Sequence, residues 1–253
     1  AKVFSTHNVN LVYTYLPTSA DKTYFLPPTL TNGNVHGIIV LNVYNERLLR
    51  LLAETQIPKV FLDTSSLVAP DELNGDLLLM ESRTSVRRIT CHLLEQGRTL
   101  PGFIGDIGYA QSNRERYEGF CQALTDAGKK VDSSLCLTTP LGIDTYREEI
   151  DTFLSSLSRM PDAFVCASDY VACILMQLLE KRGLRVPEDV AVSGFDNNTE
   201  DLLAEHLTTV QVFNEELGAR LALQILYRIK YPNTPHEITY LGTNVLYRDS
   251  TGD

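Results

Sequence analysis

The stretch from Pro161 to Asn197 is the part of the chain that most restricts the folds open to it. A short apolar run, 163–167, is followed by the polar residue Ser168, and a second apolar run, 190–195, ends in Asp196. An amphipathic helical pattern that stops at a glycine lies between the two runs. This order predicts two neighbouring parallel strands joined by a helix. Open α/β sheets bind ligands beyond the carboxyl ends of their strands, so we expect a binding edge here.

Strand and helix patterns alternate along almost the whole chain, which predicts an α/β protein with parallel sheets and crossover helices. The predicted strands are 9–15, 35–41, 59–62, 100–104, 131–137, 163–167, 190–195 and 208–212, and the predicted helices are 45–55, 82–96, 113–127, 146–157, 215–229 and one that begins at Tyr170. A length of 253 residues suits two lobes of ordinary size. We find no long linker or composition break, so several chain crossings should join the lobes.

The charge balance argues against a free-standing nucleic-acid binder. The chain has 22 basic and 32 acidic residues, a net charge of −10, whereas phosphate binding needs a basic face. The acidity fits either a cationic ligand or simple solubility, and we favour solubility. A hydrophobic content of 43% is enough to build a substantial core.

The cysteines and histidines do not form the spacings of a metal site or a disulfide framework. The five cysteines include no CxxC pair, and three of them lie in apolar segments, as small buried side chains do. The five histidines are scattered, and no GxSxG, P-loop or GxGxxG motif occurs. We therefore predict no enzyme activity, no cofactor and no metal.

The chain also carries no sign of a membrane segment. No apolar run reaches the roughly 18 residues of a membrane span, and the N-terminus has no signal-peptide core. Together with the unpaired cysteines, this favours the cytoplasm. A mature secreted protein would lack its signal as well, so that alternative stays open.

Five blocks of sequence resemble the sensing domain of the LacI/GalR (lactose and galactose repressor) transcription regulators, in that family's order. The blocks are 82–97, 97–128, 183–197 (GLRVPEDVAVSGFDN), 207–226 and 243–252. The resemblance implies a two-lobed α/β fold like that of periplasmic binding proteins. It also implies a small-molecule effector, a homodimer, and operator DNA bound through a separate helix-turn-helix headpiece.

The resemblance further implies how the chain is divided between the lobes. The N-terminal lobe would comprise 1–99 plus 212–238, and the C-terminal lobe 100–211 plus 239–253. No counterpart of the headpiece precedes Val9, and the family's first strand and first helix also have no counterpart. A sheet without its first strand would expose a hydrophobic edge, so we expect the natural chain to be longer.

Arg116 and Asp196 are the main ligand-binding candidates that the resemblance implies. Arg116 stands in an R-x-E-G-F pattern at the position of the family's ligand-clamping arginine, and Asp196 ends the Gly-Phe-Asp strand. A guanidinium offers a planar fork of donors to hydroxyls, carboxylates or phosphates. The alternatives are a solvent-facing helix arginine at 116 and a capping role for Asp196 in the turn 197–200.

The remaining candidates are Ser168, Ser112, Glu81 and Asn42. Ser168 stands where the family often has an asparagine, and of the pair Ser168-Asp169 it is the expected ligand contact. Ser112 lies before the Arg116 helix, so it could donate to ligand or cap that helix. Glu81 occupies the family's first-lobe aspartate position with one extra methylene, and Asn42 follows a predicted first-lobe strand.

Asp169 next to Ser168 is expected to cap or brace the following helix. Pro140 falls where many family members place a ring that stacks on a sugar. Tyr109 or Tyr15 could replace that ring, although each is also an ordinary surface or core tyrosine.

The sequence thus predicts the effector-binding and dimerisation domain of a repressor. A sugar or sugar phosphate would close a cleft between the lobes and change operator binding allosterically. The alternative is a periplasmic solute-binding protein of a sugar transporter, which shares the fold. The odd number of cysteines and the regulator-like sequence of residues 183–197 count against this alternative.

Overall fold

The computed structural model describes residues 2–142, 144–197 and 205–252. The chain forms two compact units. The first unit comprises Ala1–Met80, Ala110–Ser112 and Phe213–Leu241, and the second comprises Glu81–Tyr109, Asn113–Val212 and Gly242–Asp253.

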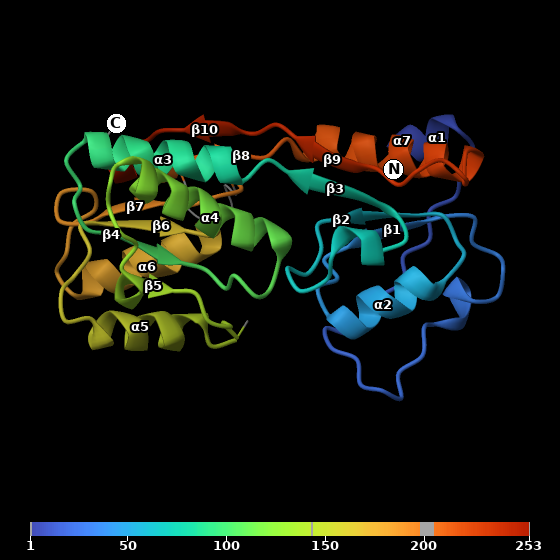
Figure 1. Cartoon of the computed structure of the whole chain (residues 1–253), viewed down its shortest axis with the longest axis horizontal. Helices are drawn as coiled ribbons and strands as arrows, with labels where there is room; N and C mark the ends of the chain where they lie inside the picture. Colours follow the sequence, from blue (N-terminus) through green and yellow to red (C-terminus); the bar gives the residue numbers. More distant parts are fainter. Residues whose placement is uncertain (1, 143, 198–204, 253) are drawn as a thin grey trace. The chain divides into compact units, whose positions relative to one another are not determined.

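The first unit contains a four-stranded parallel sheet in the order β1-β2-β3-β9 (Figure 1). Its strands are β1 (Ile38–Leu41), β2 (Lys59–Leu62), β3 (Asp76–Met80) and β9 (Ile238–Leu241). Its helices are α1 (Lys2–Thr6), α2 (Glu46–Glu54) and α7 (Asn214–Lys230), with 3₁₀ turns at Pro28–Leu30 and Pro70–Glu72. Helix α7 packs on β1 and β2, and Leu49 and Leu52 of α2 lie in the core with Phe61.

The second unit contains a parallel sheet in the order β5-β4-β6-β7. Its strands are β4 (Pro101–Ile104), β5 (Cys136–Leu137), β6 (Ala163–Cys166) and β7 (Ala191–Ser193), and an antiparallel pair joins β8 (Thr209–Gln211) to β10 (Asn244–Leu246). Its helices are α3 (Arg83–Glu95), α4 (Gln111–Asp126, which begins in the first unit), α5 (Tyr146–Ser156) and α6 (Asp169–Lys181), with 3₁₀ turns at Ser133–Leu135 and Asp249–Thr251. The two-lobed α/β fold is as predicted.

Local sequence signals explain where several helices begin and end. The Asn45 side chain accepts a hydrogen bond of 3.1 Å from the Leu48 N–H and so caps α2. Gly183 has a φ of +73°, the left-handed conformation that ends α6 and that glycine adopts without strain. Both helices follow the predicted boundaries closely.

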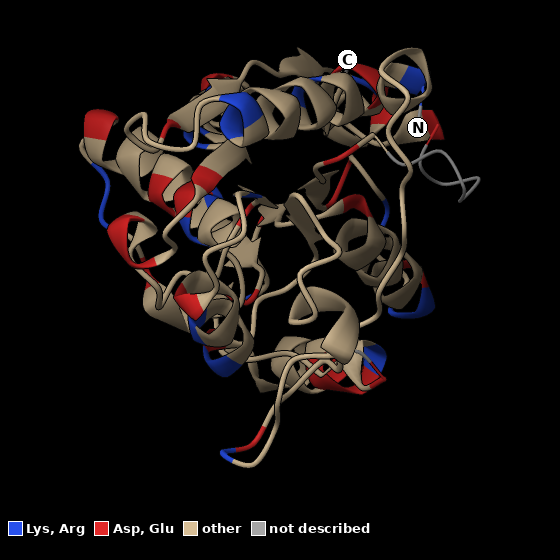
Figure 2. Cartoon of the chain, turned by 90° about the vertical axis from the view of Figure 1, so that its right-hand side faces the viewer, with Lys and Arg blue, Asp and Glu red and all other residues tan. Residues whose placement is uncertain are grey.

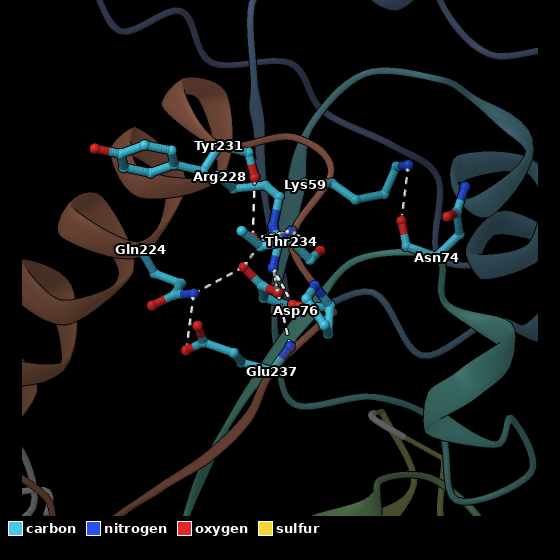
Figure 3. A network of polar contacts seen from close by, with 9 residues as sticks. Lys59, Asn74, Asp76, Gln224, Arg228, Tyr231, Thr234 and Glu237 are labelled. Carbon is cyan, nitrogen blue, oxygen red and sulfur yellow. Dashed lines mark hydrogen bonds and ion pairs between the residues drawn. The ribbon is translucent and has the colours of Figure 1, made fainter.

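A buried ion pair fastens α7 to the sheet of the first unit (Figure 3). Arg228 of α7 donates from Nη2 to Asp76 Oδ1 (2.6 Å) and from Nε to Asp76 Oδ2 (3.0 Å). The Gln224 side chain and the Glu237 backbone N–H donate to the same carboxylate. Arg228 also donates to the Thr234 and Pro235 carbonyls, so every polar group of the pair has partners. Sequence reasoning missed this network.

Three elements differ from the prediction. Of the predicted strand 131–137 only Cys136–Leu137 is a strand, because Ser133–Leu135 form a 3₁₀ turn. The predicted strand 9–15 is wrong, because these residues form no strand and Val12, Tyr13 and Tyr15 are exposed. Strand β3 was missed, although its run of apolar residues is buried on both faces between β2 and β9. Its apolar run is of the same kind as the runs 163–167 and 190–195 that were predicted as strands, so the signal was present and was overlooked.

The division of the chain also differs from the predicted lobes. The first boundary falls between Met80 and Glu81, not at residue 99, because α3 packs on β6 and β10 of the second unit. The last boundary falls after Leu241, not after residue 238, because β9 pairs with β3 of the first unit along its whole length.

Candidate functional site

The carboxyl edge of the second unit's sheet carries polar residues after three strands. Asp106 follows β4, Ser168 follows β6 and Asp196 follows β7, and β6 pairs with both of its neighbours. Parallel strands end at the same edge, so these side chains share it. The Asp169 N–H donates to the Phe195 carbonyl (2.8 Å), which links the ends of β6 and β7 directly.

Arg116 reaches this edge from α4 with only 4% of its surface exposed. Its guanidinium carbon lies 3.6 Å from the centre of the Phe195 ring. Nη1 donates to the Ala167 carbonyl, and Nη2 lies 3.5 Å from Asp196 Oδ1. The buried Nε has no hydrogen-bond partner among the described residues, a loss of about 1–3 kcal/mol. Arg116 is therefore not the solvent-facing arginine of the alternative interpretation.

Asp196 combines a half-exposed side chain with an unusual backbone. Its φ is +111°, a strained region for a residue other than glycine, and its N–H donates to the Val210 carbonyl. The protein atoms around the carboxyl remove part of its hydration and so raise its pKa, and the charge of Arg116 offsets part of that rise. With 43% of the side chain exposed, the carboxylate can accept further hydrogen bonds. The proposed capping of 197–200 falls largely on residues outside the described ranges.

Ser168 and Asp169 have different tasks at the start of α6. Ser168 Oγ accepts a hydrogen bond of 3.3 Å from the Val171 N–H and caps the helix, which leaves the hydroxyl proton able to donate elsewhere. Asp169 is buried and accepts a hydrogen bond of 2.6 Å from the Thr209 hydroxyl. The predicted bracing role of Asp169 is confirmed.

Ser112 and Asn42 both belong to the first unit. Ser112 Oγ donates to Asp63 Oδ2 at 2.6 Å, and its N–H lies 3.3 Å from Asp63 Oδ1. Asp63 follows β2, is buried, and has a φ of +61°. Asn42 follows β1, is exposed, and has a φ of +56°. Sequence reasoning missed Asp63, although an acid directly after an apolar strand was the available signal.

Glu81 lies in the second unit, not in the first lobe where the resemblance placed it. Its carboxylate accepts hydrogen bonds from the backbone N–H groups of Thr84 (2.5 Å) and Ser85 (3.1 Å) and from the Ser85 hydroxyl. These contacts satisfy the first turn of α3. The extra methylene of glutamate lets the side chain turn back onto its own helix.

The described residues contain neither a candidate metal site nor a helix that could span a membrane. Figure 2 shows basic and acidic residues scattered over the chain among stretches that carry neither. Across the described residues, no group of three His, Cys, Asp or Glu side chains could hold a metal ion. In the same part of the chain, none of the helices has the length and apolar character needed to cross a membrane.

The fold and this strand-end edge define a class: α/β proteins that bind small molecules at the carboxyl ends of parallel strands. Residues 90–251 match the family described as periplasmic binding protein-like domain. The chain therefore belongs to that family, as the effector-binding type of domain found in LacI/GalR transcription regulators.

Individual relatives agree with this assignment. The chain is 27% identical over 206 residues to the transcriptional repressor PurR of Glaesserella parasuis. The matched residues make up 81% of this chain and 59% of the repressor. It is 31% identical over 170 residues to the regulator DegA of Bacillus subtilis, covering 66% of this chain and 48% of DegA. The chain thus spans only about half to three fifths of the length of these two relatives.

Solved structures show the same fold. The transcriptional regulator CelR, in a complex with cellobiose, superposes with a TM-score of 0.75 at 27% identity, covering 88% of this chain and 68% of CelR. A LacI family regulator from Enterococcus faecium, with bound ribose, has a TM-score of 0.76 at 22% identity, covering 98% of this chain and 90% of that one. The second likeness concerns the fold alone.

Proposed function

We propose that the chain is the small-molecule-sensing and dimerisation domain of a LacI/GalR-type repressor, and that its effector is a sugar or a sugar phosphate. The observation that carries the proposal is the buried Arg116 fork beside the half-exposed Asp196 at the carboxyl edge of a parallel sheet. A fixed guanidinium donates to ligand oxygens, and the carboxylate accepts from hydroxyl groups. Ser168 would add a hydroxyl donor at the same edge.

The named relatives support this choice of function. They are transcriptional repressors and regulators, so a transporter's periplasmic solute-binding protein or an enzyme is the less supported alternative. The regulator CelR was solved with cellobiose, which supports a sugar as the effector class. A cytoplasmic location fits this function and the free cysteines of the described chain.

In this proposal the effector also contacts the first unit, where Asn42 and Ser112 are the candidates, with Glu81 kept as a weaker one. Binding would favour one arrangement of the two lobes. In the whole homodimeric protein, that arrangement would set the spacing of the paired headpieces on operator DNA. The coupling requires that the effector makes different contacts in the two arrangements.

A thermal-shift screen against sugars, sugar phosphates and nucleobases tests the proposal. A ligand at 100 times its Kd adds about 2.7 kcal/mol of stability, which raises Tm by about 5–10 °C. Arg116→Ala should abolish that shift, because it removes the fixed donors. The matched control is Arg159→Ala, an exposed arginine of the same unit, which should leave the shift unchanged. A ligand that stabilises Arg116→Ala as well as the wild type would remove Arg116 from the site.

A further inference from the structure

Two consecutive residues after β7 have positive φ angles, a conformation that residues other than glycine rarely adopt. The φ angle is +111° at Asp196 and +53° at Asn197. In this conformation the Asp196 carboxylate lies 3.5 Å from Arg116 Nη2. Residues persist in such backbone regions only where their surroundings fix them. The contacts that fix this turn therefore also fix the carboxylate at the candidate effector site.

A buried hydroxyl on β8 supports the turn. Thr209 is 0% exposed, and its Oγ1 accepts a hydrogen bond of 3.2 Å from the Asn197 N–H. The same hydroxyl donates to Asp169 Oδ1 at 2.6 Å. A hydroxyl has a single proton to donate, so the Asp169 carboxylate sets the direction of that proton and leaves the oxygen lone pairs for the Asn197 N–H. Thr209 thus ties the turn to the start of α6 from a position that no ligand can contact.

The Asn197 side chain is bonded at both ends of its amide. Its Nδ2 donates to Gln211 Oε1 at 2.6 Å, and its Oδ1 accepts from Arg248 Nη2 at 2.8 Å. Arg248 is itself anchored, because its backbone N–H donates to Thr208 Oγ1 (2.7 Å) and its Nη1 donates to the Leu207 carbonyl (3.1 Å). These bonds connect the turn to β8 and to the segment that follows β10, and they give the amide one defined orientation.

We propose that Thr209 and Asn197 are positioning residues for the effector site, which hold Asp196 in the strained turn that places its carboxylate beside Arg116. The inference rests on the proposed function, because it takes from there the role of Asp196 as an acceptor for the effector. It adds that the acceptor depends on a buried hydroxyl and on an amide, and that both act through the backbone of the turn.

The test follows the ionisation of the Asp196 carboxyl in the ligand-free chain. The protein atoms around this carboxyl raise its pKa above 3.8, and the charge of Arg116 offsets part of the rise. A carboxyl released from the turn would regain hydration, so its pKa would fall toward 3.8. An NMR titration of protein with ¹³C-labelled aspartate measures this pKa. The Asp196 signal is assigned by its loss in Asp196→Asn.

Four substitutions separate positioning from general stability. Thr209→Val removes the hydroxyl at nearly the same side-chain shape, and Thr209→Ser retains the hydroxyl. Thr90→Val is the matched control, since Thr90 is also 0% exposed in the second unit and its hydroxyl donates within its own helix, α3. Asn197→Gly is a second probe, because glycine adopts the positive φ without strain but lacks both amide contacts.

The Asp196 pKa should fall toward 3.8 in Thr209→Val and in Asn197→Gly, whereas Thr209→Ser and Thr90→Val should titrate like the wild type. A merely structural role of the hydroxyl would lower stability in Thr209→Val and leave the Asp196 pKa where it is. An Asp196 pKa that is unchanged in both Thr209→Val and Asn197→Gly overturns the inference. Should Thr209→Val fail to fold, the titration of Asn197→Gly decides alone.

Cellobiose binding, measured in parallel by thermal shift, separates this inference from the proposed function. Where cellobiose binds in an Arg116-dependent way, Thr209→Val should weaken its affinity about tenfold, the value of one hydrogen bond to a charged group, and Thr209→Ser should not. Equal affinity in Thr209→Val and the wild type also overturns the inference. If cellobiose does not bind the wild type, or binds Arg116→Ala equally well, that result counts against the proposed function, and the titration still decides the role of Thr209.

Discussion

Arg228→Met should destabilise the first unit more than any surface charge substitution. The variant keeps a flexible apolar stem but removes the guanidinium, which leaves Asp76, which is fully buried, without its cation. Breaking a buried, hydrogen-bonded ion pair on one side costs about 3–5 kcal/mol. Two donors to Asp76 remain, the Gln224 side chain and the Glu237 N–H, so we expect the lower half of that range.

Urea unfolding followed by circular dichroism measures this change as a shift of the midpoint at an unchanged m-value. The matched control is Arg50→Met, which removes an exposed ion pair with Glu72 in the same unit and should shift the midpoint far less than Arg228→Met does. A double variant, Asp76→Leu with Arg228→Met, should recover part of the loss, because it leaves no unpaired charge. An Arg228→Met variant within 1 kcal/mol of the wild type would refute the reasoning.

The same pair predicts an acid dependence. Burial raises the pKa of Asp76, but the hydrogen bonds from Arg228, Gln224 and the Glu237 N–H outweigh it, so the pKa is lowered from 3.8. The contribution of this ion pair to the stability of the folded state is therefore present above pH 3.8 and is lost as pH falls through the lowered pKa of Asp76. In Arg228→Met the buried carboxylate lacks its cation, so its pKa is higher than in the wild type. The stability difference between wild type and Arg228→Met should therefore narrow as pH falls, first as Asp76 is protonated in the variant and then as it is protonated in the wild type.

Three further predictions concern single residues. Asn45→Ala should destabilise the chain by about 1 kcal/mol, measured by urea unfolding, because it removes the cap of α2. Gly183→Ala should cost about 1–2 kcal/mol in the same assay, since alanine is strained at a φ of +73°. Burial raises the pKa of the Cys166 thiol well above 9.0, so native protein should not react with iodoacetamide at Cys166 at pH 8, while urea-unfolded protein should.

The sequence predicts most of the fold because the helices and strands carry local signals. Alternating apolar spacing, the Asn45 cap and the Gly183 stop each act within a few residues. Strand β3 and the exposed segment 9–15 escape this reasoning for opposite reasons. The first has an apolar run after Asp76 like those at 163–167 and 190–195 and was overlooked, whereas the second has a strand-like pattern but pairs with no other strand.

The candidate site is predictable only in part, since burial and side-chain partners depend on contacts between distant residues. The resemblance indicates Arg116 and Asp196, but nothing local shows that Phe195 lies under the guanidinium. The pairing of Asp76 with Arg228 spans 152 positions and has no sequence signature. Glu81 was misplaced because a resemblance to a family position says nothing about which unit α3 packs against.

Gly194 directly precedes Phe195, the residue whose ring lies under the Arg116 guanidinium. Gly194 can therefore affect the position of that guanidinium without itself being a ligand-binding candidate. A side chain at 194 would collide with the carboxylate of Asp169. The backbone N–H of Asp169 donates to the Phe195 carbonyl, and its carboxylate accepts from the Thr209 hydroxyl. Gly194→Ala should therefore displace Asp169 and shift the Phe195 ring on which the guanidinium lies. We expect Gly194→Ala to weaken any Arg116-dependent ligand shift in Tm, although residue 194 is itself buried behind the edge. An undiminished shift in a folded Gly194→Ala variant would mean that Arg116 is held by α4 and the Ala167 carbonyl alone.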